Sequence, residues 1–425
     1  MINKTFETKQ GIKTHIIENK LFKTNIVCVI LTVPLNIETV TQNALIPFLL
    51  RSGSKKYKSQ LEISKHLEEM YGASFDCGID KIGDNQLLKF YIEGINDSFL
   101  PNKDSILKEM LDMLLELIFN TNIENGEFNT EILNIEKNNL KQKIEAKKDD
   151  KDFYAFETCI SKMYGENGFG IFKYGRIKDL ENINSKNLAQ IYNKLIQTAK
   201  IDIFISGNIK NDNIVEFLNQ NENIKKLNPR PENIVLNNEY TENKQEVNSI
   251  QVFQDKMDIV QGKLVIGLDI FSKQENLSSI AFVYNSILGN GSNSMLFQNV
   301  REKESLAYSV KSMYIRPKGN IFIRCGIEIE NYDKALSLIK KQVSDILEGK
   351  FTEKDIENAK KFLISGIRNI PEEQDTEIVF YIGAEISKTE KSLDFYIDQI
   401  NKVTKEDIIK FAEQLKYNII YFLRG

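Results

Sequence analysis

The sequence has no tryptophan, seven prolines, four cysteines and only two histidines in 425 residues. Of these scarcities, that of histidine argues against the most functions. A zinc site built from several imidazoles, or acid–base chemistry that uses several histidines, has almost no residues to draw on. Any metal site that uses an imidazole must include His15 or His66.

Targeting and membrane segments are also missing. The first 20 residues contain no apolar core segment with a small-residue cleavage site, so we expect no signal peptide. No apolar run approaches the roughly 18 residues of a membrane span. The cysteines lack C-x-x-C spacing, and Cys28, Cys159 and Cys325 lie in apolar segments. We therefore expect buried thiols without disulfides or metal, in a cytoplasmic protein.

The overall composition indicates a globular chain. Hydrophobic residues make up 41% and charged residues 27%, with a net charge of −4. This charge argues against a basic surface for nucleic acid. The length predicts two to three domains.

The chain contains a duplication. In each half, short alternating segments predict strands and longer segments with helical periodicity predict helices. The first half is predicted to hold strands at 25–33, 74–80 and 86–93 and helices at 60–71 and 105–119. The second half is predicted to hold strands at 263–270, 306–313 and 320–327 and helices at 276–288, 295–303 and 333–347.

The later parts of the two halves also correspond. Residues 128–144 parallel 351–367, and the segment ending at Gly207 parallels the one ending at Gly425. Ser185 and Thr404 occupy matching positions and are predicted to cap their helices.

These elements predict an α+β fold of two homologous domains, each a largely antiparallel sheet with helices packed on one face. The expected boundaries are a first domain at 1–220, a polar linker at 221–248 and a second domain at 249–425. The linker is rich in Asn, Glu and Lys, a composition typical of solvated connections.

The catalytic motifs that can be sought by spacing are mostly absent. The sequence has no nucleophile elbow and no phosphate-binding loop. His66 and Glu69 share one helix face and offer two metal ligands. No second histidine lies on that helix, so we favour a helix-surface histidine beside acidic neighbours.

The segment 288–310 is more specific. Gly289 and Gly291 form a turn between two helices, and the sequence VREKESLAYSV follows. Arg301 lies near a helix end, and Tyr308 follows seven residues later, where the pattern turns to strand. Such a pair can bind a peptide carbonyl or an oxyanion. The alternative is an arginine that complements the helix dipole and a half-buried strand tyrosine.

The run LGNGSNSMLFQNVREKESLAYSV resembles the second-domain signature of the pitrilysin/insulinase zinc-peptidase family, of the mitochondrial processing peptidase type. The family pattern combines a glycine-rich turn, S-x-L-F and R-E-x-x-x-L-A-Y. It is met by Gly289, Gly291, Ser294, Leu296, Phe297, Arg301, Glu302, Leu306, Ala307 and Tyr308. The resemblance covers nearly the whole chain and implies two duplicated domains that enclose a chamber.

The family's zinc motif, H-x-x-E-H, is lost. Aligning Gly53–Tyr57 with the family's G-T-x-K-[YR] segment places Ala44 and Phe48 at the two histidine positions and Pro47 at the general base. The third ligand position falls near Lys143, and a slip in the register of the alignment would select Gln142 or Glu145 instead. The replacements at 44, 47 and 48 can neither bind zinc nor transfer a proton, and Pro47 is expected to interrupt or bend a helix.

The resemblance therefore implies a non-catalytic subunit of a two-chain peptidase. Zinc and H-x-x-E-H would belong to a sister subunit, with no cofactor in this chain. Arg301 and Tyr308 would act on the peptide or small-protein substrate in trans, beside a substrate-binding turn of Gly289, Gly291 and Ser294. Two alternatives remain: a scaffold of the same fold without any role in proteolysis, and a self-sufficient peptidase using His66 and Glu69.

Overall fold

The computed structural model describes residues 2–101, 105–209, 213–230, 249–271, 274 and 276–425. The chain forms two compact units, and both are assembled from separate stretches of sequence. The first comprises Met1–Ala146, Glu166–Asn237 and Pro371–Ile386. The second comprises Lys147–Gly165, Asn238–Ile370 and Ser387–Gly425.

The first unit contains a six-stranded sheet in the order β1-β2-β6-β3-β5-β4. All neighbouring strands are antiparallel except β2 and β6. In that order, the strands are β1 (Ile2–Lys9), β2 (Ile12–Glu18), β6 (Lys200–Gly207), β3 (Thr24–Pro34), β5 (Asn85–Ile95) and β4 (Ser74–Ile82).

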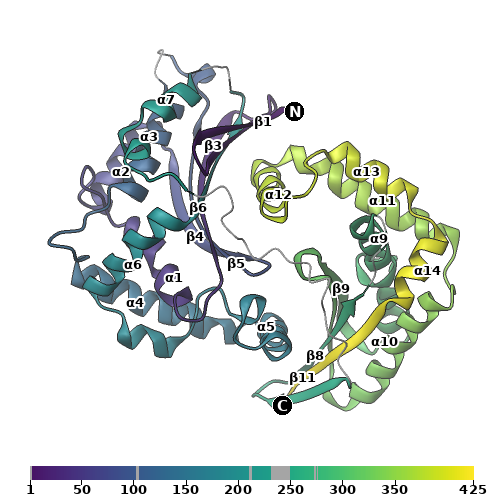
Figure 1. The fold of residues 1–425 in the computed structure, drawn as a ribbon. Helices are drawn as coiled ribbons and strands as arrows, with labels where there is room; N and C mark the ends of the chain where they lie inside the picture. The colour runs from purple at the N-terminus through teal and green to yellow at the C-terminus, as the bar shows by residue number, and fades with distance from the viewer. Residues whose placement is uncertain (1, 102–104, 210–212, 231–248, 272–273, 275) are drawn as a thin grey trace. The chain divides into compact units, whose positions relative to one another are not determined.

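One face of this sheet is covered by helices that follow the strands in the sequence (Figure 1). Alternation along β3 explains this layer, because Val27, Val29 and Leu31 all point into the core shared with the helices. The helices of the unit before residue 231 are α1 (Val40–Leu50), α2 (Gln60–Glu69), α3 (Ile106–Phe119), α4 (Thr130–Glu145), α6 (Ser185–Thr198), α7 (Ile214–Gln220) and α8 (Glu222–Lys225).

The second unit contains a five-stranded sheet in the order β7-β11-β8-β10-β9, with β7 and β11 parallel. Its strands are β7 (Gln251–Lys256), β11 (Leu415–Arg424), β8 (Gln261–Ile270), β10 (Asn320–Glu328) and β9 (Ala307–Ile315). Its helices after residue 249 are α9 (Leu277–Gly289), α10 (Tyr332–Leu347), α11 (Glu353–Asn369), α13 (Leu393–Lys402) and α14 (Lys405–Glu413). A π-helical stretch, η5, spans Phe297–Lys303.

The opposite face of each sheet carries a helix supplied by the other half of the chain. In the first unit this is α12 (Gln374–Ser387), whose Ile378 and Ile382 pack against Cys28, Ile30 and Phe204. In the second unit it is α5 (Lys151–Tyr164). Phe156 of α5 makes an edge-on contact with Phe322, and Asp152 pairs with Arg324 on β10. Both halves are therefore needed to cover both faces of either sheet.

The predicted α+β architecture with largely antiparallel sheets is confirmed, with local differences. Asn184, rather than Ser185, caps α6, because the Asn184 side chain accepts from the amides of residues 186 and 187. Thr404 caps α14 as expected. Pro47 does not interrupt α1, since nearly every residue of that helix is buried and tertiary packing compensates for the missing donor.

The polar segment after residue 220 is described as far as residue 230. It contains α8 and, beyond it, Arg230, which is fully buried and donates to the carbonyl oxygens of Ile196, Ala199 and Asn228. The contacts with Ile196 and Ala199 satisfy carbonyl groups at the C-terminal end of α6. The rest of the predicted linker, residues 231–248, lies outside the described residues.

The thiols and the surface agree with the composition. Cys28, Cys77, Cys159 and Cys325 are free and buried, as expected. Burial raises the thiol pKa of Cys28, Cys77 and Cys325 to about 12.

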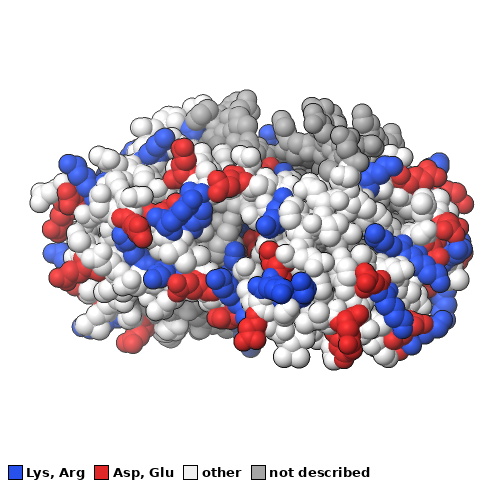
Figure 2. All heavy atoms as spheres, turned by 90° about the horizontal axis from the view of Figure 1, so that it is seen from below, with Lys and Arg blue, Asp and Glu red and all other residues white. Residues whose placement is uncertain are grey.

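On the face shown in Figure 2, basic and acidic side chains are interspersed. None of the described helices is long and apolar enough to cross a bilayer.

Candidate functional site

The position of the lost zinc motif is filled by an apolar helix surface. Ala44, Pro47 and Phe48 lie on α1, and all three are buried. Residues 44 and 48 are one helical turn apart and share a face, the spacing that a pair of zinc-binding histidines requires. Lys143 of α4 reaches the same place, with its Nζ 5.3 Å from the centre of the Phe48 ring. The three aligned ligand positions therefore converge, and none carries a ligand.

Cations surround the Phe48 ring. The guanidinium carbon of Arg51 lies 5.5 Å from the ring centre, and Arg51 Nη2 is 3.8 Å from Glu136 Oε1. Both cations gain from the electron-rich face of the ring. A divalent metal here would face the charges of Arg51 and Lys143 without any histidine.

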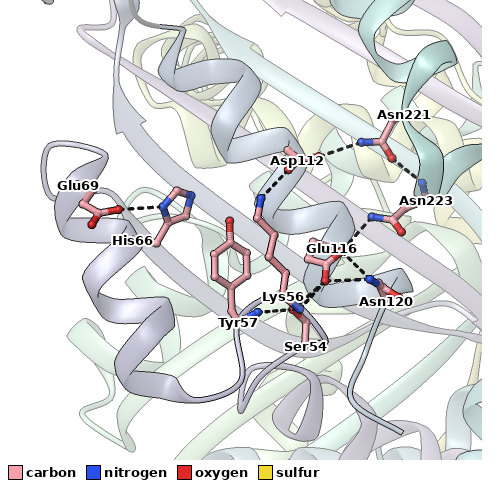
Figure 3. Close-up of polar contacts among 10 residues, drawn as sticks. All are labelled: Ser54, Lys56, Tyr57, His66, Glu69, Asp112, Glu116, Asn120, Asn221 and Asn223. Carbon is pink, nitrogen blue, oxygen red and sulfur yellow. Dashed lines mark hydrogen bonds and ion pairs between the residues drawn. The ribbon is translucent and has the colours of Figure 1, made fainter.

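The segment used to align the motif is held by a buried carboxylate (Figure 3). Glu116 of α3 accepts hydrogen bonds from Ser54 Oγ and the Lys56 amide, each at 3.0 Å. The Asn120 and Asn223 side chains complete the set of donors. Burying a carboxylate is tolerated when its oxygens are satisfied in this way, so Glu116 fixes the turn that follows α1.

His66 and Glu69 do not form the core of a metal site. The His66 Nδ1 is 3.4 Å from Glu69 Oε2, and its ring stacks on Tyr57 with 5.0 Å between ring centres (Figure 3). Within the described residues, neither belongs to a cluster of three potential ligands. This arrangement fits the helix-surface interpretation.

The one group of three potential metal ligands among the described residues is His15, Asp202 and Glu385. His15 Nε2 is 3.0 Å from Asp202 Oδ1, and its Nδ1 is 3.0 Å from Thr5 Oγ1. Lys200 Nζ lies 2.8 Å from Asp202 and 3.1 Å from Glu385. The ammonium group occupies the space between the carboxylates, so these residues form an ion network that holds α12 on the sheet. Although burial acts in the opposite sense, His15 and Lys200 lower the pKa of Asp202.

The glycine-rich turn of the second unit is built by close packing. A side chain at Gly289 would place its Cβ 2.7 Å from both Leu296 and the Ser312 amide nitrogen. Gly291 adopts a φ of +117°, which is open to glycine and strained for other residues. Ser294 is buried, and its hydroxyl donates to the Gly291 carbonyl at 2.7 Å. These three residues give the turn its shape.

Arg301 lies on η5, where the helix widens to π geometry, an irregularity frequent at functional sites. Its side chain is 44% exposed, its Nε is 3.5 Å from Glu302 Oε1, and its guanidinium carbon is 4.7 Å from the Phe297 ring centre. The guanidinium group is therefore partly supported by the Phe297 ring, and its exposed part is available to a ligand.

Tyr308 lies at a β-bulge. Ala307 pairs with Ile327 and Ser309 pairs with Gly326, so Tyr308 is the extra residue on β9. A bulge redirects a side chain, and Tyr308 is accordingly 60% exposed, unlike the half-buried strand residue of the alternative interpretation. Its hydroxyl donates to Glu328 Oε1 at 3.1 Å, and this hydrogen bond raises the phenol pKa.

Glu328 was not predicted from the sequence. It ends β10, 20 residues from Tyr308, and nothing in its local pattern distinguishes it from other surface glutamates. Only the register between β9 and β10 brings it to the tyrosine.

Comparison with known proteins supports the family resemblance. The family "Peptidase M16 inactive domain" matches residues 182–363. "Probable inactive metalloprotease YmfF" of Bacillus subtilis is 29% identical over 426 residues, covering 100% of this chain and 98% of its own length. "Non-peptidase homolog YmxG" of Helicobacter pylori is 24% identical, covering 63% of this chain and 61% of the relative.

Solved structures agree on the fold. A conserved protein from Enterococcus faecalis V583 superposes with a TM-score of 0.89 at 28% identity, covering 100% of this chain and 98% of that one. A peptidase M16 inactive domain from Pseudomonas fluorescens gives a TM-score of 0.78 at 18% identity, with the same coverage. The duplicated fold and the missing ligands define a metallopeptidase homologue without its metal site. The comparisons therefore support a non-catalytic, zinc-less homologue of the M16, or pitrilysin/insulinase, peptidases.

Proposed function

We propose that this chain is the non-catalytic subunit of a two-chain M16 peptidase. A sister subunit with an intact H-x-x-E-H motif would bind zinc, and this chain would contribute Arg301 and Tyr308 to the peptide. The observation that carries the proposal is the contrast between the two units. The first unit has lost its ligands at Ala44 and Phe48, while Arg301 and Tyr308 remain exposed on irregular backbone.

The chemistry assigned to the pair is electrostatic. The exposed part of the Arg301 guanidinium can donate to a scissile carbonyl and to the oxyanion that develops from it. The turn of Gly289, Gly291 and Ser294 would lie along the substrate and offer backbone groups. The substrate class is a peptide or small protein bound in extended form, and the four free cysteines favour the cytoplasm.

Glu328 sets a condition on the role of Tyr308. A phenol has one proton, and Tyr308 donates it to Glu328. In this state the hydroxyl can only accept, for example from a peptide N–H. To stabilise an oxyanion, the hydroxyl must turn away from Glu328 and present its proton to the substrate.

Replacing Glu328 by glutamine is expected to lower the phenol pKa of Tyr308, because the neutral amide no longer opposes the phenolate. The measurement is ultraviolet titration of the tyrosines. Subtracting the curve of Tyr308→Phe from that of the wild type isolates Tyr308, and subtracting the curve of Glu328→Gln/Tyr308→Phe from that of Glu328→Gln isolates it in the variant. Glu330→Gln, on the following turn, is the control. A phenol pKa that stays unchanged in E328Q would contradict the pairing of Tyr308 with Glu328.

The proposal is tested by reconstitution with a partner that carries H-x-x-E-H. We expect peptide cleavage only when both chains are present, and zinc that purifies with the partner. The scaffold alternative would be favoured if the partner cleaves the peptide fully without this chain, although the two chains form a stable complex when mixed. Stoichiometric zinc on this chain alone would instead favour the self-sufficient peptidase.

A further inference from the structure

The strand β4 forms an outer edge of the first unit's sheet, beside the lost metal position. The Cys77 thiol of β4 donates to the carbonyl oxygen of Pro47 on α1 at 3.3 Å. An unpaired strand edge is a template on which an extended peptide can add as a further strand. Whether this edge is open therefore decides whether a peptide backbone can add to the sheet beside the lost metal position.

The hairpin between β4 and β5 shows which backbone groups face outward. Ile82 pairs with Asn85 across the two-residue turn Gly83–Asp84. The pair that closes such a turn exchanges both hydrogen bonds, and the pattern alternates along the ladder. The amides of Phe75, Cys77, Ile79 and Lys81 consequently point toward the free edge.

Two of these four amides already have acceptors. The Asp76 side chain accepts from the Cys77 amide at 2.7 Å, and the Asp80 side chain accepts from the Lys81 amide at 2.9 Å. Each carboxylate belongs to the residue just before the amide that it caps. Hydrogen bonds to an ionised acceptor are stronger than those an incoming peptide carbonyl offers.

Neighbouring side chains hold both carboxylates in place. Asp76 Oδ2 accepts from the Tyr91 hydroxyl at 3.2 Å. Asp80 Oδ2 accepts from Lys89 Nζ at 2.9 Å, and Lys173 lies 3.8 Å from Oδ1. Although burial acts in the opposite sense, these two lysines lower the pKa of Asp80, so it is ionised at neutral pH.

We infer that Asp76 and Asp80 close the β4 edge, so that this edge accepts neither an extended peptide nor the sheet edge of a second copy. A strand arriving here would have to displace two carboxylates, and its carbonyl oxygens would meet their negative charge. The strand edge beside the lost metal position is therefore closed as a backbone template. This inference concerns the chain alone and stands whether or not the proposed partner exists.

The test compares D76A/D80A with D76N/D80N. Alanine removes the acceptor at both positions, whereas asparagine keeps a carbonyl oxygen that can still cap the amide. The probe is a fluorescein-labelled peptide of about ten alternating threonine and valine residues, long enough to span the strand. We expect anisotropy to report at least about tenfold tighter binding by the alanine pair than by wild type or the asparagine pair.

Hydrogen exchange supplies a second measurement that needs no ligand. In the wild type, the amides of Cys77 and Lys81 should exchange more slowly than those of Phe75 and Ile79, and the difference should vanish in D76A/D80A. Binding of the probe along β4 of the wild type would overturn the inference. Unchanged peptide binding by D76A/D80A would also overturn it, whatever the rate of hydrogen exchange at Cys77 and Lys81. Peptide binding by D76N/D80N as tight as that by D76A/D80A would overturn it as well.

Discussion

Replacing Arg301 by alanine should lower the kcat of the reconstituted two-chain peptidase by about 10²–10³, with a much smaller change in KM. The reason is that the guanidinium would act on charge that develops in the transition state, while ground-state contacts along the peptide are retained. Initial rates with a quenched fluorescent peptide, measured over a range of substrate concentrations, separate the two constants.

Lys303→Ala is the matched control, because Lys303 is an exposed cation on the same π-helical stretch. It should leave the rate within about twofold if steering by net charge is unimportant. Arg301→Lys should restore only part of the activity, since an ammonium lacks the planar fork of a guanidinium. Full activity of Arg301→Ala in a complex of unchanged stability would refute the proposed role.

The sequence predicted the elements around Arg301 and Tyr308 but not their irregularities. Alternation and helical periodicity place a helix before residue 303 and a strand after residue 306, because burial of one face produces these patterns. The π-helical turn at Arg301 and the bulge at Tyr308 leave no such pattern. Each depends on how the segment packs within its unit, so the exposure of both side chains had to come from the structure.

The packing of α5 and α12, each on the sheet of the other half of the chain, could not be predicted from the sequence either. The sequence of either helix shows an apolar stripe, which says that the helix must pack on something apolar without saying where. Their true partners lie more than a hundred residues away, as in the contact of Phe156 with Phe322. Local patterns cannot choose among distant apolar surfaces that look alike.

At the lost zinc position, the alignment foresaw which residues would converge. Ala44, Phe48 and the region of Lys143 were expected there because the family pattern supplied their correspondence. The cation–π contact between Lys143 and Phe48 was not foreseen, since it depends on the rotamers of two side chains. The capping of the β4 edge by Asp76 and Asp80 likewise required the register of a hairpin.

Glu377 of α12 makes the stability of the first unit depend on pH. The side chain is fully buried against the sheet, where it accepts from Ser206 Oγ at 3.3 Å. Its Oε1 has no hydrogen-bond partner in the described part of the chain. Burial raises the Glu377 pKa from 4.5 to about 7, against the weaker opposing effects of Ser206 and Asn19. The folded state therefore takes up a proton between these two pH values.

The contribution of Glu377 is fully present below about pH 4.5 and is lost as the pH rises through 7. A shift from 4.5 to about 7 corresponds to about 3 kcal/mol of unfolding free energy. Urea unfolding at pH 5, 6 and 7.5 should show this loss in the wild type. Glu377→Gln, which mimics the neutral acid, should be close to wild type at pH 5 and more stable by up to about 3 kcal/mol at pH 7.5 or above.

The comparison between wild type and Glu377→Gln cancels the contributions of the other ionisable groups, which both proteins share. Glu373→Gln, on the exposed turn that precedes α12, is the control and should follow the wild-type pH dependence. Parallel curves for wild type and Glu377→Gln would show that this carboxyl is not the source. If the curves diverge between pH 5 and 7.5, the helix donated by the second half packs on the first sheet most stably when the Glu377 carboxyl is protonated. The packing of α12 on the first sheet would then be least stable under alkaline conditions.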